Sequence, residues 1–409
     1  MRLFLYNLIT ISLVPFFIFR LLLKSFKDNG YRTNLKNRVG IYKETSRNSI
    51  WFHAVSLGEV NASEKLISKY KKTNQIVLTV TTATGYRYAK KNFNDEVIVV
   101  YAPWDVKFFV ENFIKQFKPK ILILIETEIW PSMIHILNEN SIPIVLANAR
   151  LSESSLKKYL FFKSFSKDVF NKISLILAQN ENSKMRFSKI SDFPERIKNV
   201  GSIKFEYDKI NLFKKEKISS DFILASSTHD GEDEIIIDNF LKLKSLHEHL
   251  KLMIVPRHPE RANGIKNYLD KKNIRSKIMT EIPSKFLSYD CIVISQIGVL
   301  NNLYQQAKIA FVGGSLFKKY GGHNIIEPAV CECSFIVGPY MKNFEDILDE
   351  FKINDACIQI NKNNQLLSAF KDLIENDKMR ENMQIKARNV VLKNRGSLEK
   401  QYDLIKSFL

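Results

Sequence analysis

Acidic residues follow two apolar runs in the first half of the sequence, at positions where they could take part in proton transfer. Glu59 lies in HAVSLGEV (53–60), at the expected turn into a helix, and Glu126 and Glu128 lie in ETEIWP (126–131), directly after ILILI. A carboxylate held in a cleft can act as a general acid or base. A glutamate in a first helical turn also interacts with the helix dipole, so both interpretations stay open for Glu59. The end of so apolar a run is seldom fully exposed, which favours function for the pair in ETEIWP, one acid acting and the other supporting it.

Groups that could bind an anion occur in the second half. Arg257, in PRHPER (256–261), presents a planar guanidinium that suits a phosphate or a carboxylate, although a surface ion pair would explain it equally well. The segment GGSLFKKYGGHNIIEPA (313–329) has two glycine pairs in a chain with only 14 glycines, and it leads into a helix whose N–H groups could hold an anion. Asn324 and Glu327 also fit a reciprocal helix cap, which is the alternative explanation of that pair. Neither G-x-S-x-G nor G-x-x-x-x-G-K-[ST] occurs, which disfavours the commonest hydrolases and nucleotide-hydrolysing enzymes.

The elements that must position these side chains are two series of short apolar runs separated by amphipathic segments. Their nearly continuous hydrophobicity is typical of parallel strands covered by helices on both faces. The expected strands are 49–55, 75–82, 96–103, 120–126, 142–149 and 174–180 in the first series, and 222–228, 250–256, 290–295, 308–315 and 334–339 in the second. A polar, lysine-rich linker near 205–220 separates the series. The sequence therefore predicts an α/β protein with two doubly wound domains, in which ligands bind beyond the carboxyl ends of the strands.

The N-terminal segment has a different pattern. An apolar run of 17 residues, Leu3–Phe19, lies at the lower edge of what spans a hydrocarbon layer of about 30 Å. The basic residues that follow it are Arg20, Lys24, Lys27, Arg32, Lys36 and Arg38. Such a flank is cytosolic by the positive-inside rule and is attracted to anionic lipid. We therefore expect residues 1–24 to anchor the chain at a membrane, with a buried core helix as the alternative.

Composition narrows the class of protein further. With 45% hydrophobic and 26% charged residues, the chain is neither largely disordered nor a multi-span membrane bundle. Its 62 basic and 43 acidic residues give a net charge of +19, but no basic stripe interleaved with aromatic residues points to nucleic acid, so we expect no nucleic-acid partner. The four cysteines include no C-x-x-C pair, which disfavours both a disulfide framework and a zinc ribbon.

Taken in order, the strand-end motifs HAVSLGEV, ETEIWP, NARLS, VGSIKF, SSTHDGE, PRHPER and GGHNIIEPA resemble those of the 3-deoxy-D-manno-octulosonic acid (Kdo) transferases of lipopolysaccharide synthesis. The resemblance implies a GT-B fold with two Rossmann-like domains facing a cleft. It implies an inverting transfer of Kdo from CMP-Kdo onto the lipid A precursor (lipid IVA), without a cofactor or an active-site metal. The enzyme would work on the cytosolic side of the bacterial inner membrane, in contact with anionic lipid. The expected organisation is a membrane anchor at 1–24, an acceptor-binding domain at 25–205 and a CMP-Kdo-binding domain at 206–409.

The resemblance also assigns roles to residues. Glu59 would be the general base for the acceptor hydroxyl, and Glu126 and Lys204 would stabilise the transition state. The expected CMP-Kdo contacts are Pro256, Arg257, Ile297, Gly298, Val299, Asn324, Ile325, Ile326 and Glu327, with Glu327 suited to the ribose hydroxyls. The family usually reads G-E-L where this chain reads QIGVLNNLY, so Val299 replaces an acid and the backbone around Gly298 would have to serve.

The two-domain fold alone does not fix the reaction. Another GT-B enzyme, such as a nucleotide-sugar epimerase or a different lipid-directed glycosyltransferase, is the alternative enzyme. A membrane-bound scaffold whose acids only cap helices is the non-catalytic alternative.

Overall fold

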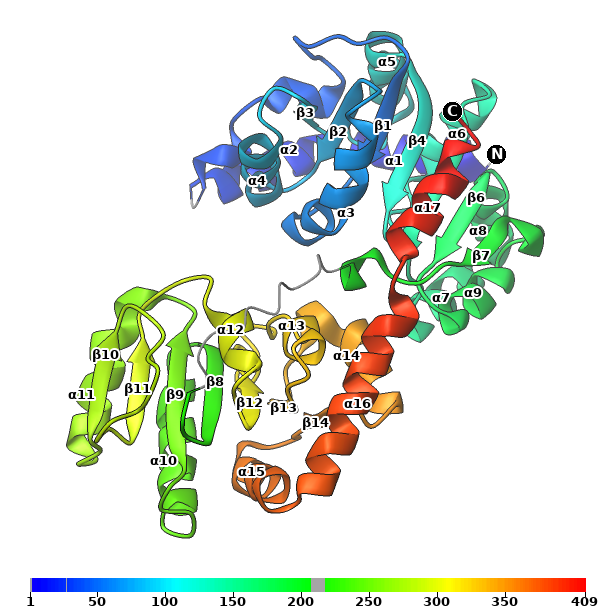
Figure 1. The fold of residues 1–409 in the computed structure, drawn as a ribbon. Coiled ribbons are helices and arrows are strands. Elements are labelled where there is room, and N and C mark those ends of the chain that lie inside the picture. The colour runs from blue at the N-terminus through cyan, green and yellow to red at the C-terminus, as the bar shows by residue number, and fades with distance from the viewer. Residues whose placement is uncertain (1, 27, 207–217) are drawn as a thin grey trace. The chain divides into compact units, whose positions relative to one another are not determined.

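The computed structural model describes residues 2–26, 28–206 and 218–409. The chain forms two compact units, one from Met1–Glu206 together with Asn394–Leu409 and one from Tyr207–Lys393 (Figure 1). Most of the expected linker, 205–220, falls outside the described residues, as does Lys27 of the basic flank.

The first unit contains a seven-stranded parallel sheet in the order β3-β2-β1-β4-β5-β6-β7. Its strands are β1 (Ser49–His53), β2 (Ile76–Val80), β3 (Ile98–Tyr101), β4 (Pro119–Ile125), β5 (Ile144–Ala149), β6 (Leu175–Ala178) and β7 (Ile197–Asn199). Its helices after the N-terminal segment are α3 (Leu57–Tyr70), α4 (Ala83–Phe93), α5 (Lys107–Phe117), α6 (Pro131–Glu139), α7 (Glu153–Phe161), α8 (Lys163–Phe170), α9 (Glu181–Ser188) and α17 (Ser397–Lys406).

Both faces of this sheet are covered, which explains the continuous hydrophobicity of its strands. In β1, Phe52 packs into one apolar cluster and its neighbour Trp51 into another, because successive side chains of a strand point to opposite faces. The strand order reverses between β1 and β4. Ligands of open α/β sheets bind at such a switch point, so the residues after β1 and β4 have the favoured position for chemistry.

The N-terminal segment forms α1 (Arg2–Ser12) and α2 (Val14–Ser25), with Pro15 in the first turn of α2. Among the described residues, no single helix is both long and apolar enough to cross a bilayer. Taken together, α1 and α2 have the length and composition of a membrane span, but the pair is bent by 45°. The side chain of Phe4 is 73% exposed and that of Phe19 is 59% exposed, so the alternative of a buried core helix is wrong. Arg38, expected in the lipid-facing flank, is instead buried over the Tyr101 ring.

The C-terminal segment lies in a different unit from the one that the expected domain boundaries gave it. Residues 206–409 were predicted to form one domain, but Asn394–Leu409 belongs to the first unit. In α17, Leu398 and Ile405 are buried in the same apolar cluster as Phe52, and the Tyr70 hydroxyl donates to the Tyr402 carbonyl at 2.7 Å (α17 is red in Figure 1). These contacts are too distant along the chain to be predicted from local patterns.

The second unit repeats the architecture with a seven-stranded parallel sheet, β10-β11-β9-β8-β12-β13-β14. Its strands are β8 (Phe222–Thr228), β9 (Lys251–Pro256), β10 (Ser276–Met279), β11 (Cys291–Ile294), β12 (Ile309–Val312), β13 (Phe335–Val337) and β14 (Ile358–Gln359). Its helices are α10 (Glu232–Lys244), α11 (Ala262–Lys271), α12 (Leu300–Tyr304), α13 (Ile326–Val330), α14 (Glu345–Ile353), α15 (Leu366–Glu375) and α16 (Asp377–Asn394), whose last residue joins the first unit. The switch point lies between β8 and β12.

The expected α/β class with two doubly wound sheets is confirmed. Every expected strand corresponds to a strand of the structure, and the unexpected strands β7, β10 and β14 all lie at sheet edges. These three strands are short and have exposed or half-buried positions, so their sequences lack the buried apolar run by which the other strands were recognised.

Candidate active site

Glu59 lies in the first turn of α3, directly after β1. Ser56 caps the helix, and its hydroxyl donates to Glu59 Oε1 at 2.8 Å, while the Val55 N–H donates to Oε2 at 2.6 Å. The side chain is therefore fixed by its own turn. Only 9% of the residue is exposed, and this burial raises the pKa of Glu59 to about 7, against the two hydrogen bonds, which lower it. The carboxyl group can thus accept or release a proton near neutral pH.

Glu126 and Lys204 meet beside it. Glu126 follows β4 in the left-handed backbone region, with φ at 62°, and its Oε1 lies 2.6 Å from Lys204 Nζ. The charge of Glu126 raises the pKa of Glu59 and that of Lys204 lowers it, so all three groups share one electrostatic environment. The structure thus brings together the three residues for which catalytic roles are expected, at the switch point between β1 and β4.

Glu128 differs from Glu126. Burial, followed by the charges of Glu59 and Glu126, raises the pKa of Glu128 to about 8. A carboxyl group with that pKa is mostly protonated at neutral pH, whereas Glu126 has an ammonium partner. Glu126 thus forms a direct ion pair with Lys204, whereas burial raises the pKa of Glu128. The spacing of ETEIWP does not reveal this difference.

Lys204 is positioned by residues that the sequence reasoning missed. It lies in a 3₁₀ turn, Ile203–Phe205, whose first N–H donates to Asn148 Oδ1 at 3.1 Å. Gln401 of α17 accepts from the Asn148 N–H at 2.9 Å and donates to the Gly201 carbonyl at 3.1 Å. Asn148 carried a signal, since it lies in the motif NARLS. Gln401 carried none, because its partners are 200 and 253 residues away.

In the second unit a buried carboxylate organises the glycine loop after β12. The Cβ of any other residue at 313 would lie 2.6 Å from the Ser227 carbonyl oxygen, so the loop requires glycine there. Glu232, at the start of α10 and fully buried, accepts hydrogen bonds of 2.6–2.9 Å from the backbone N–H groups of His229, Gly314, Ser315 and Leu316. Local sequence does not separate this role from ordinary helix capping, because three of the donors lie 82 to 84 residues further along the chain.

Cationic and imidazole groups gather at the same edge of this sheet. Pro256 ends β9 and is buried, and Arg257 follows it with an exposed side chain. His229 Nε2 lies 2.8 Å from His323 Nε2, and the His229 ring stacks on Tyr320 at 4.0 Å. Burial and neighbouring positive charges, including that of Arg257, lower the pKa of both histidines to about 4. Such a surplus of positive charge suits an anionic ligand.

The remaining expected contacts divide into side chains that are accessible and side chains that are not. Ile297 is 79% exposed, and Gly298 has a positive φ of 84° with open space around it. By contrast, the side chains of Val299, Ile325 and Ile326 are buried at 6%, 0% and 2% exposure. These three residues can offer a ligand only their backbone, which corrects any expectation of side-chain contact.

Asn324 and Glu327 contact each other, but they do not form the reciprocal cap that their spacing allowed, because α13 begins after Ile325 and has no side-chain cap. Asn324 Oδ1 accepts from the Ile326 N–H at 3.0 Å and its Nδ2 donates to Glu327 Oε1 at 3.2 Å. The charge of Glu327 also contributes to a raised pKa of the buried Tyr304, which places this carboxylate near the end of α12. The residues expected at the nucleotide thus lie at the end of β9, in the segment between β11 and α12, and at the start of α13, all at or after the ends of strands of the second sheet. Within the described part of the chain, no group of three or more histidine, cysteine or acidic side chains has the arrangement of a metal site.

Comparisons with known proteins agree with this architecture. A family model described as 3-deoxy-D-manno-octulosonic-acid transferase (kdotransferase) matches residues 33–207. A 3-deoxy-D-manno-octulosonic acid transferase of Haemophilus influenzae is 33% identical over 99% of this chain and 98% of the relative. A transferase of the same name from Aquifex aeolicus is 30% identical over 83% of this chain and 92% of the relative.

Solved structures show the same two-domain fold. A glycosyltransferase of Rickettsia africae gives a TM-score of 0.54 at 15% identity over 90% of this chain and 99% of its own. S. aureus MnaA in complex with UDP gives 0.53 at 14% identity over 88% of this chain and 96% of its own. At such identities the similarity shows the fold alone, and it confirms the expected GT-B arrangement of two Rossmann-like sheets.

Proposed function

Since the chain belongs to the Kdo transferase family and is a glycosyltransferase of that class, we propose that it moves Kdo from CMP-Kdo onto the lipid A precursor, with inversion at the anomeric carbon and with Glu59 as the general base. The observation that carries this proposal is the cluster of Glu59, Glu126 and Lys204 at the switch point of the first sheet. A nucleotide-sugar epimerase, a different lipid-directed glycosyltransferase and a scaffold without activity are set aside, because the relatives that match nearly the whole chain are Kdo transferases.

In the proposed mechanism Glu59 takes the proton of the acceptor hydroxyl as that oxygen attacks the anomeric carbon of Kdo. Its pKa of about 7 leaves a large fraction ionised at neutral pH while keeping it basic enough to accept the proton. The ammonium group of Lys204, paired with Glu126 at 2.6 Å, provides positive charge for the negative charge that the sugar carboxylate and the leaving phosphate bring to the transition state.

The CMP-Kdo donor is proposed to bind at the carboxyl edge of the second sheet. Arg257 has an exposed guanidinium for the phosphate or the carboxylate. The N–H groups around Gly298 replace the acid that is absent at Val299, since the Val299 side chain is buried. Glu327, already oriented by Asn324, is suited to accept hydrogen bonds from ribose hydroxyls. No step requires a metal or a cofactor.

The proposed location is the cytosolic face of the bacterial inner membrane. The exposed apolar side chains of α1 and α2 support insertion into the lipid interface. The basic side chains of Lys24, Arg32 and Lys36 would meet anionic lipid head groups there. Whether the bent pair spans the bilayer or lies in its interface does not affect the proposed chemistry.

The test is a transfer assay with purified protein, CMP-Kdo and tetra-acylated lipid A precursor, following CMP release and the mass of the lipid. We expect a mass increase by one or more Kdo units, lost in Glu59→Gln. Folded wild-type protein that releases no CMP and leaves the lipid unchanged would refute the proposed donor and acceptor.

A further inference from the structure

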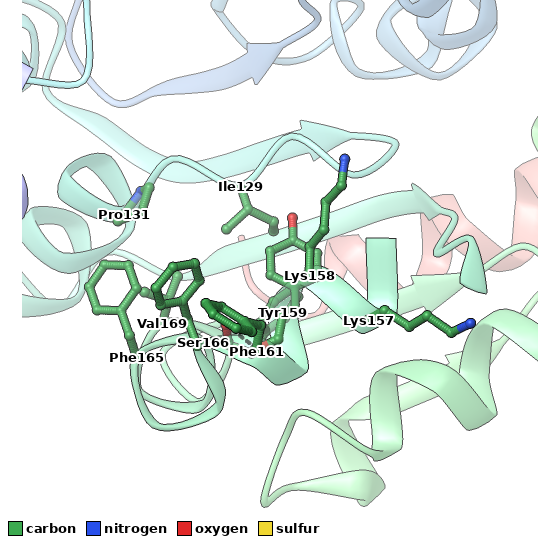
Figure 2. Close-up of a pocket in the computed structure, with 11 residues that line it drawn as sticks. Ile129, Pro131, Lys157, Lys158, Tyr159, Phe161, Phe165, Ser166 and Val169 are labelled. Carbon is green, nitrogen blue, oxygen red and sulfur yellow. Dashed lines mark hydrogen bonds between the residues drawn. The ribbon is translucent and has the colours of Figure 1, made fainter. Parts of the chain in front are cut away.

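An apolar pocket of about 580 Å³ lies in the first unit, between the start of α6 and the pair α7 and α8 (Figure 2). Small-molecule sites usually have volumes of about 300–1,000 Å³. Aromatic rings supply much of the wall, and two of them, Phe161 and Phe162, are 81% and 64% exposed. Large apolar side chains exposed around a pocket mark a site that an apolar ligand or surface covers.

The pocket adjoins the acidic cluster. Ile129, which lines it, follows Glu128 in the chain. Tyr159 lines it too, and burial, followed by the charge of Glu128, raises the pKa of Tyr159 to about 12. In Figure 2 the Tyr159 hydroxyl points away from the rings of Phe161 and Phe165. A ligand with an apolar part in this pocket would therefore place its polar part beside the carboxylates of the candidate active site.

Positive charge borders the same pocket. Lys157 and Lys158 line it, and Figure 2 shows their ammonium groups directed away from the aromatic rings. Neither lysine forms an ion pair with any residue in the described part of the chain. Two available ammonium groups next to an apolar pocket match a ligand with an apolar tail and an anionic head.

One wall of the pocket also contacts α1. The Tyr6 ring of α1 lies 6.0 Å from the ring of Phe165, which forms one wall of the pocket. On the same helix, Leu5 and Ile9 are 56% and 50% exposed. If α1 lies in the lipid interface, the pocket therefore lies close to the bilayer that holds the acyl chains.

From these four observations we infer that the pocket binds one acyl chain of the acceptor lipid, and that Lys157 and Lys158 contact an anionic group on the same lipid. This inference rests on the proposed function, because it assumes that the acceptor is an acylated, anionic lipid. It assigns the α7–α8 pair a role in acceptor selection: the enzyme distinguishes acylated from chain-free acceptors through this pocket rather than only through membrane attachment.

The test is the double variant Phe161→Ser/Phe162→Ser, assayed in detergent with the tetra-acylated acceptor and with the same acceptor after removal of its acyl chains. We expect the KM for the tetra-acylated acceptor to rise at least tenfold, with kcat/KM for the deacylated acceptor changed less than twofold. Both side chains are largely exposed, so the fold should be unaffected, which thermal unfolding checks.

The matched control is Phe108→Ser. Phe108 is 60% exposed, stands next to another phenylalanine in α5 as Phe162 stands next to Phe161, and does not line the pocket. An equal loss for both acceptors, no loss for either, or the same loss in the control would overturn the inference.

Calorimetric binding of the two acceptors separates this inference from the proposed function. Weaker binding of the tetra-acylated acceptor alone in the double variant supports the pocket even if the wild-type protein transfers no Kdo. Unchanged binding in the double variant refutes the pocket even if transfer is observed.

Discussion

Replacement of Glu59 by glutamine should abolish most activity and stabilise the folded protein at alkaline pH. The amide has nearly the shape of the carboxyl group: its oxygen can accept from the Val55 N–H, and its nitrogen can donate to Ser56 Oγ, so both local contacts survive. What disappears is the capacity to take up a proton. Loss of a positioned general base lowers the rate by about 10²- to 10⁴-fold.

The stability effect follows from the raised pKa. Below pH 4.5 Glu59 is protonated in both the folded and the unfolded chain, and its burial costs little. Between 4.5 and about 7 the unfolded chain releases the proton while the folded chain retains it, so stability falls as pH rises. Above pH 7 the carboxyl group is ionised in both states, and the whole pKa difference lowers the free energy of unfolding by about 3 kcal/mol. Glutamine, being neutral, avoids this cost.

The measurements are kcat/KM for the acylated acceptor across pH 5 to 9 and the free energy of urea unfolding at pH 5 and pH 8.5. In the wild type, kcat/KM should increase with pH up to about 7. The glutamine variant should unfold with a larger free energy than the wild type at pH 8.5 and with a much smaller difference at pH 5. Retention of more than a tenth of wild-type kcat/KM, or a variant that is less stable at pH 8.5, would refute the reasoning.

Three further predictions test positions outside the catalytic carboxylates. Gln401→Ala leaves the buried Asn148 N–H without its acceptor, which should lower the free energy of unfolding by about 1–3 kcal/mol. Because Asn148 holds the turn that carries Lys204, the variant should reduce kcat more than it raises KM. An unchanged kcat in a folded variant would exclude the proposed positioning of Lys204. Glu232→Ala leaves four backbone N–H groups without a partner, so we expect the free energy of unfolding to fall by at least about 2 kcal/mol. Because these N–H groups shape the glycine loop after β12, beside the proposed donor site, CMP should also bind more weakly in calorimetry. Full CMP affinity would show that the loop does not contribute to that site. Leu5→Glu/Ile9→Glu should weaken binding to anionic vesicles at least tenfold in a flotation assay while preserving turnover in detergent, and undiminished flotation would contradict the membrane proposal.

Much of the fold is encoded in local patterns. Strands buried on both faces carry apolar side chains at most positions, so β1, β4 and β5 appear as largely apolar runs that can be recognised without tertiary information. The edge strand β7 does not, since two of its three residues are exposed. The α/β class and the position of the acids at strand ends therefore follow from the sequence alone, whereas the switch point between β1 and β4 comes from the strand order in the structure.

The candidate site could be predicted only in part. Glu59 and Glu126 stand out because they follow apolar runs. The choice between Glu126 and Glu128 could not be made, because it depends on which carboxylate Lys204 contacts. That lysine lies 78 positions beyond Glu126 in the chain, and it is positioned by Gln401, a residue without any motif.

What the sequence by itself determined was the set of elements and the residue types at their ends, because both depend on interactions within a few residues and on which faces are buried. Only the tertiary structure decided which charges are compensated, which expected contacts are buried, as for Val299 and Ile326, and to which unit the C-terminal helix belongs. These properties depend on burial and on contacts between distant residues. The pKa of about 7 at Glu59 is the clearest case, since its main cause is the burial that folding imposes.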